Sequence, residues 1–147
     1  MKLKTLTAIM FAAMLGACGS STPNPDALAE DFLAESALTV ELLCECFDDY
    51  GYTSEQECID ENTLFDAITE QCILDEIYLF DNVEQIAYGL ECRYEVAVVY
   101  NDCIANTTCG DELAVEDCED DADYNFSFCA DFPDALDDAI NENCFAF

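Results

Sequence analysis

The chain has 147 residues, of which 34 are acidic and three are basic, and it contains no histidine and no tryptophan. This charge excludes a nucleic-acid-binding surface, which needs clustered lysine and arginine, and it repels anionic lipid headgroups while attracting divalent cations or a basic partner. The lack of histidine excludes a Ser-His-Asp triad, and an apolar content of 52% favours a folded domain over an acidic disordered chain.

Residues 1–17 have the layout of a secretory signal peptide. A lysine-containing start precedes an apolar run that is too short to span a bilayer, and small residues follow. The sequence LGAC that ends at Cys18 resembles the bacterial lipobox, in which the chain is cut before a cysteine that then carries lipid. The resemblance implies a lipid anchor on Cys18, and the alternative is an ordinary signal peptide cut after Ala17 that leaves Cys18 as a thiol.

The residues after Cys18 indicate where such an anchor would be sorted. Gly19 and Ser20 resemble the start of lipoproteins of the outer membrane, since an aspartate there is the usual signal for retention in the inner membrane. We expect 18–24 to be the lipidated cysteine with a flexible tether, and 25–147 to be an acidic, cysteine-rich helical domain. The predicted location is the cell envelope, lipid-anchored in the outer membrane and facing the periplasm or the exterior.

Apolar residues recur every three or four positions along this domain, which is typical of amphipathic helices. The first expected helix begins at Pro25 and ends at Gly51, the second opens with a capping box at 54–57, and the third follows an apolar stripe over 64–80. The fourth opens with a capping-box spacing at 81–84 and continues through the stripe Cys92, Val96, Val99 and Cys103. The fifth follows a stripe over 115–129, and the last runs from Pro133 to Cys144. Gly89 should weaken the fourth helix by about 1 kcal/mol relative to alanine. The pattern predicts an all-α fold, a small disulfide-stapled bundle of five to six helices.

Ten cysteines remain if Cys18 is lipidated, and an even number in an exported chain predicts up to five disulfides. The chain has no CxxC pair and no histidine, which argues against a metal–thiolate site. The candidates are Cys44, Cys46, Cys58, Cys72, Cys92, Cys103, Cys109, Cys118, Cys129 and Cys144.

Two cysteine spacings predict a helical hairpin. Cys92 and Cys103 are eleven positions apart, as are Cys118 and Cys129, so each pair lies on one face of its helix. Antiparallel packing about the turn IANTTCGDE would pair Cys103 with Cys118 and Cys92 with Cys129, and a local Cys103–Cys109 bridge is the alternative. The arrangement resembles the twin-cysteine hairpins of the coiled-coil-helix-coiled-coil-helix proteins, which have nine intervening residues where this chain has ten. The resemblance implies the hairpin geometry alone.

The other predicted disulfides are Cys46–Cys58 around the Gly51 turn, Cys44–Cys72 and Cys109–Cys144. The run CF…YGY-S…C from Cys46 to Cys58 resembles a loose group of cysteine-rich helical lipoproteins of Gram-negative bacteria. This second resemblance implies no particular activity.

An acidic segment, EDCEDDADYN at 116–125, has the composition of a calcium site. The D-x-D-x-N spacing from Asp121 to Asn125 matches the first half of an EF-hand loop, but Phe126 and Phe132 replace its glycine and its bidentate glutamate. We favour a solvated acidic face of the fifth helix over a calcium loop. The candidate calcium ligands are Asp117, Asp121, Asp123 and Asn125.

Together these features favour a non-enzymatic, membrane-anchored acidic lipoprotein with a structural or interaction role. Its expected partners are the membrane, through the lipid alone, and a basic protein or divalent cation, with no nucleic acid and no cofactor other than calcium. A calcium-dependent or cation-binding surface module is the alternative. A hydrolase that uses paired carboxylates is the third hypothesis, because 34 acidic residues offer many suitable separations.

Overall fold

The computed structural model describes residues 24–63, 65–81 and 83–145, and over these the chain is all-helical, as predicted. The predicted signal peptide at 1–17 and the lipidated Cys18 lie outside this part of the chain. The described helices are α1 (Pro25–Cys44), α2 (Glu55–Asn62), α3 (Ala67–Leu79), α4 (Val83–Ala105), α5 (Glu112–Phe126) and α6 (Asp134–Cys144). None of them is both long enough and apolar enough to cross a membrane.

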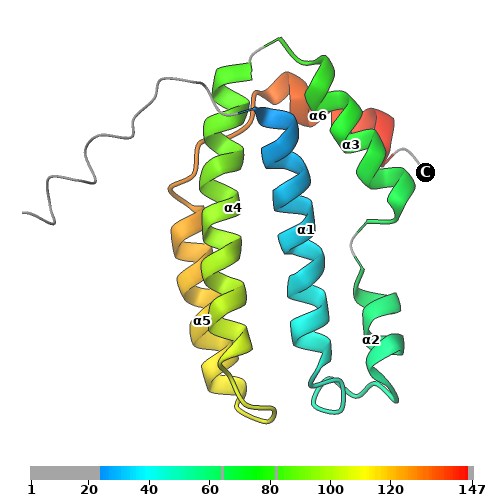
Figure 1. Ribbon diagram of the computed structural model, residues 1–147, viewed down its shortest axis with the longest axis vertical. Helices are drawn as coiled ribbons and strands as arrows, with labels where there is room; N and C mark the ends of the chain where they lie inside the picture. The colour runs from blue at the N-terminus through cyan, green and yellow to red at the C-terminus, as the bar shows by residue number, and fades with distance from the viewer. Residues whose placement is uncertain (1–23, 64, 82, 146–147) are drawn as a thin grey trace, which may run out of the picture.

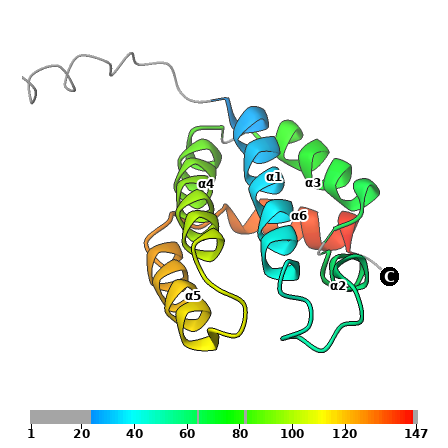
Figure 2. The same cartoon turned by 60° about the horizontal axis from the view of Figure 1, so that its bottom comes forward.

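The longest helix, α4, lies between α1 and α5, and the three run side by side (Figure 1). Helices α3 and α6 pack against each other at one end of this layer, and α2 packs on α1 near the opposite end (Figures 1 and 2). Since α5 packs chiefly on α4, one side of α5 is left to solvent. The main core lies where α1, α3, α4 and α6 meet, and its buried residues are Ala29, Ile73, Ile77, Ile86, Leu90, Leu136 and Cys144.

Side-chain caps explain where several of these helices begin. Ser54 accepts a hydrogen bond from the Glu57 backbone N–H at 3.1 Å, which is half of the predicted capping box. The carboxylate of Glu57 accepts instead from the Thr53 hydroxyl and from the Thr53 backbone N–H, the latter at 2.8 Å, and these two hydrogen bonds lower the pKa of Glu57. Asp66 and Asp111 cap α3 and α5 in the same way as Ser54 caps α2.

Two helices end earlier than their apolar stripes predict. Helix α1 stops at Cys44, and residues 45–51 form successive tight turns that close at Gly51, whose φ of 81° is the left-handed conformation that glycine adopts without strain. Helix α5 stops at Phe126, so Cys129 lies three residues beyond the helix on which it was expected. Each of these helix ends is followed by a cysteine in a long-range disulfide, Cys46 after α1 and Cys129 after α5. The spacing of apolar residues along a helix carries no information about such a bridge.

Five disulfides join the ten cysteines of the described residues. Two of them confirm the predicted hairpin, Cys92–Cys129 and Cys103–Cys118, and exclude the local Cys103–Cys109 alternative. The other three are Cys44–Cys58, Cys46–Cys109 and Cys72–Cys144.

The predicted pairings Cys46–Cys58, Cys44–Cys72 and Cys109–Cys144 are therefore wrong. The buried Cys44 at the end of α1 forms a disulfide with Cys58 of α2. Cys46, two residues further on, forms one with Cys109 in the α4–α5 connection. Cys72 meets Cys144 because α6 packs on α3. The α4–α5 turn and α6 lie at opposite ends of the molecule, which separates Cys109 from Cys144 (Figure 1).

A buried polar contact fixes the register of α1 against α4. Asn101 of α4, which is 4% exposed, donates through Nδ2 to the carbonyl oxygen of Glu35 at 2.9 Å and to Oε2 of Glu35 at 2.8 Å. Its Oδ1 accepts from the Thr39 hydroxyl at 2.6 Å. Because a buried amide needs all of these partners, sliding α1 along α4 by one turn would leave polar atoms unpaired.

Candidate functional site

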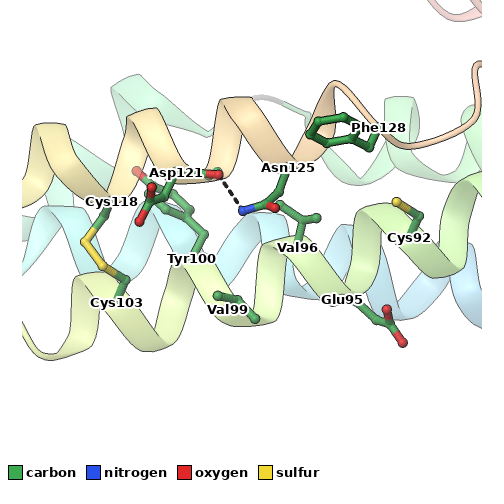
Figure 3. A pocket seen from close by; sticks show the side chains of 11 residues that line it. Cys92, Glu95, Val96, Val99, Tyr100, Cys103, Cys118, Asp121, Asn125 and Phe128 are labelled. Carbon is green, nitrogen blue, oxygen red and sulfur yellow. Dashed lines mark hydrogen bonds between the residues drawn. A yellow bond between two sulfur atoms is a disulfide. The ribbon is translucent and has the colours of Figure 1, made fainter.

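The candidate site is a groove between α4 and α5, the two helices of the twin-cysteine hairpin. The Cys103–Cys118 disulfide crosses it at one end and Cys92 marks the other end (Figure 3). The space between the helices has a volume of about 510 Å³. We call this space the α4–α5 groove, and its side chains other than cysteine are Glu95, Val96, Val99, Tyr100, Asp121, Ala122, Asn125 and Phe128.

Two of the apolar residues in this lining are unusually open to solvent. Val99 is 66% exposed and Phe128 is 68% exposed, whereas the sequence stripe placed Val99 on the packed face of its helix. The ring of Phe128 lies edge-on to that of Tyr124, which is 66% exposed, with 4.9 Å between centroids. The apolar part of the groove therefore continues onto the outer surface near the end of α5.

The polar side of the groove is anionic. All seven acidic residues of α5 are exposed, and the helix carries no basic residue; they are Glu112, Glu116, Asp117, Glu119, Asp120, Asp121 and Asp123. Asp121 of α5 and Glu95 of α4 both line the groove, and the Glu95 carboxylate extends from the side of α4 that faces away from α5 (Figure 3). A cationic group entering the groove would consequently meet carboxylates from both helices.

Tyr100 reports the same electrostatic field from inside the groove. Its pKa is raised from 10.0 to about 12, first because the phenol is partly desolvated and then because Glu119, Tyr50 and Asp123 oppose a further negative charge. Tyr50 has a pKa that is raised by burial and then by Glu119. Both phenols are therefore neutral across the physiological range, and their surroundings disfavour added anions.

The four calcium candidates all lie on α5. Asp121 and Asn125 line the groove, and Asn125 Nδ2 donates to the backbone oxygen of Asp121 at 2.7 Å, a bond within one turn of the helix (Figure 3). Asp117 and Asp123 are exposed on the same helix. The segment that matches half of an EF-hand loop is thus helical, whereas an EF-hand holds calcium in a loop.

A different cluster brings metal-ligand atom types together. Within the described part of the chain, Cys46, Asp49 and Cys109 form such a group. Their sulfur and carboxylate ligand atoms all lie within 4.8 Å of one another. The two sulfurs of this group are joined as a disulfide, so neither is a thiolate. Asp49 accepts from the Gly110 backbone N–H, which gives its carboxylate a structural role beside the bridge.

A clasp of α4 residues holds the α5–α6 connection at the Cys92 end of the groove. Arg93, the only basic side chain in the described residues, donates through Nη1 to the Ala130 carbonyl at 3.4 Å and lies over the Phe132 ring at 4.6 Å from its centroid. A Cβ on Gly89 would lie 3.1 Å from both Ala130 O and the Phe132 ring. A larger residue at position 89 would therefore require the connection to shift by a few tenths of an ångström, which glycine avoids.

Sequence reasoning found the hairpin but missed the groove and the clasp. The available signals were the lone arginine among residues 18–147 and a glycine inside a predicted helix, both of which are unusual where they occur. The exposed apolar pair of Val99 and Phe128 had no such signal, because Val99 belongs to a stripe that was expected to be buried and Phe128 belongs to no predicted motif. No protein-family model matches the chain, and neither a curated protein nor a solved structure is significantly similar to it.

Proposed function

We propose that this protein is a lipid-anchored, non-catalytic lipoprotein of the outer membrane whose acidic helical domain binds a cationic partner. The observation that carries the proposal is the exposed carboxylate surface of α5, which has seven acidic residues and no basic one. The single positive charge of Arg93 offsets little of this negative charge, since its guanidinium contacts the Ala130 carbonyl and the Phe132 ring. Such a surface attracts basic proteins and raises their rate of encounter at low salt.

The disulfides support a role outside the cytoplasm. Five bridges in one small domain are typical of oxidising compartments, where they compensate for a limited core. The proposed lipid on Cys18 would hold the domain at a membrane that its charge otherwise repels. The tether and the rigid domain would then have separate tasks, attachment and recognition.

The anchor is tested by intact-mass analysis of the full chain expressed in a Gram-negative host. The expected result is loss of residues 1–17 and a mass increase for a diacylglyceryl group and an amide-linked acyl chain, with neither change in the Cys18→Ser variant. A chain cut after Ala17 with an unmodified Cys18 would contradict the proposal.

The partner class is tested by pull-down from envelope extracts at two salt concentrations. A charge-driven partner should be captured at about 50 mM NaCl and lost at about 500 mM, because exposed charges are screened within a few ångströms at the higher ionic strength. Loss on addition of a chelator at constant ionic strength would instead favour the calcium-dependent alternative. Calcium should then also raise the melting temperature more than sodium chloride of matched ionic strength.

A further inference from the structure

An exposed apolar strip lies beside the carboxylates of the α4–α5 groove. Val96 and Val99 come from successive turns of α4, and Phe128 reaches the same space from beyond the end of α5 (Figure 3). Val99 and Phe128 each leave about two thirds of their surface in water, at 66% and 68%. Contiguous exposed apolar surface that is rimmed by polar residues is a feature of interaction sites, whereas single scattered apolar residues need no explanation.

Charge decides which occupant this strip suits. A second copy of the chain would bring another α5-type surface, and an anionic membrane would bring phosphates, so both are repelled by Glu95 and Asp121. An uncharged apolar molecule would leave the carboxylates of the rim without a complement. A segment with an apolar stripe between basic residues matches both parts of the groove.

We propose that the α4–α5 groove binds an amphipathic cationic helix of a partner protein. The inference rests on the proposed function and deepens it, since it names the site and the recognition element. From Cys92 to Cys103 the groove follows three turns of α4, about 16 Å at 1.5 Å per residue. A partner helix of three to four turns fills that length, with apolar anchors at positions i, i+3 or i+4, and i+7 and with lysine or arginine on both flanks.

The apolar anchors would cover Val99 and Phe128, and the flanking cations would pair with Glu95 of α4 and Asp121 of α5. Tyr100 extends between these two helices with a neutral phenol, which adds a hydrogen-bonding group to the floor without adding charge. Affinity then depends on the order of residues in the partner and not on its charge alone.

Two peptides of identical composition test this dependence. Both contain leucine and lysine in equal numbers over 14 residues, one with leucines at the spacing of a helical stripe and one with the order scrambled. Each labelled peptide is titrated with the full-length chain in phosphatidylcholine nanodiscs, with empty nanodiscs as the blank, and fluorescence anisotropy reports binding at about 50 mM NaCl. The striped peptide should bind at least about tenfold more tightly than the scrambled one.

A pair of variants separates the groove from general charge attraction. Val99→Glu and Ile68→Glu each replace an exposed apolar side chain with a carboxylate, the first in the groove and the second on α3, where Ile68 is 80% exposed. Because both variants add negative charge, attraction by charge alone predicts unchanged or tighter binding for both. The groove predicts that V99E weakens binding of the striped peptide at least about tenfold, with I68E within about twofold of the parent.

Phe128→Glu is a second groove variant for the case in which V99E has a changed circular dichroism spectrum, and it should weaken binding similarly. Equal binding of both peptides, or no loss in either groove variant, would overturn the groove while leaving the cationic-partner proposal intact. Absence of binding by either peptide even at about 20 mM NaCl would overturn that proposal as well. A dimer in sedimentation that V99E dissociates would assign the groove to a second copy and also refute the inference.

Discussion

Asn101 offers the sharpest test of how burial controls the energetics of this fold. Its Nδ2 donates to two oxygens of Glu35, at 2.9 Å and 2.8 Å, between α4 and α1. Asn101→Asp changes the shape very little but replaces this donor with an acceptor. Both hydrogen bonds then become oxygen–oxygen contacts, and one of them faces the Glu35 carboxylate.

The magnitude follows from the bonds that are lost. A hydrogen bond to a charged group is worth about 1.5–3 kcal/mol and a neutral one about 1 kcal/mol, and leaving a partly buried charge without its partner costs about 3–5 kcal/mol in related cases. We therefore expect N101D to lower the free energy of unfolding by about 3–5 kcal/mol. That is a large share of the 5–15 kcal/mol typical of a single domain.

Asn143→Asp is a matched control, because Asn143 of α6 donates to Oε1 of Glu76 of α3 at 2.7 Å but is exposed. Water screens the new carboxylate there, so N143D should cost less than about 1 kcal/mol. Urea unfolding with disulfides intact, followed by circular dichroism at 222 nm, measures both. The N101D deficit should shrink as the pH falls, because a protonated carboxyl can donate again. Equal costs for the two variants within about 0.5 kcal/mol would refute the argument from burial.

Three further outcomes follow from features of the hairpin and its clasp. Gly89→Ala should lower the free energy of unfolding, because its Cβ would lie 3.1 Å from the α5–α6 connection, although alanine stabilises an open helix by about 1 kcal/mol relative to glycine. Arg93→Met should lower the free energy of unfolding by about 1 kcal/mol, because it removes the contacts with the Ala130 carbonyl and the Phe132 ring. Urea unfolding measures both variants. Folding raises the pKa of Tyr100 from 10.0 to about 12, so the ionised phenol favours the unfolded state and stability falls as the pH rises through that window. A titration followed by absorbance at 295 nm should show a late tyrosine ionisation step in the parent that is missing in Tyr100→Phe. If the variant gives the same curve as the parent, the late step belongs to another tyrosine. Graded treatment with a dithiol, followed by alkylation and peptide mapping, should open Cys46–Cys109 before the buried Cys44–Cys58 bridge, since Cys109 is exposed; simultaneous opening would contradict this order.

The helices were predictable because their signals are local. The stripe over 64–80, the Ser54 cap and the proline at position 25 each depend on neighbours within four residues, and their described residues lie in or next to helices of the structure. The twin-cysteine hairpin was predictable for a related reason. Equal spacing of the cysteines on either side of the α4–α5 turn leaves one antiparallel register in which both pairs meet, although Cys129 lies just beyond the end of α5.

The remaining disulfides depend on how helices far apart in the sequence pack, which periodicity does not specify. Cys46 and Cys109 are 63 positions apart, and Cys72 and Cys144 are 72 apart. The groove is hidden in the sequence for a similar reason, since Val99 continues the same stripe as Val96 but lies toward the open side of the hairpin. Val99 is exposed because none of the helices in residues 24–63, 65–81 and 83–145 covers α4 and α5 on that side, and the local sequence of the hairpin does not specify this.

The overlapping bridges also determine how the domain responds to proteolysis. The loops closed by Cys44–Cys58, Cys46–Cys109 and Cys72–Cys144 together enclose every peptide bond from Cys44 to Cys144. A single cut anywhere in that span leaves the two pieces covalently joined. Among the described helices, α1 is the one whose backbone lies before this closed span. For a chain held by its N-terminus, shedding of the domain would thus require cleavage in α1 or before it, so surface loops such as 106–111 can be nicked without release.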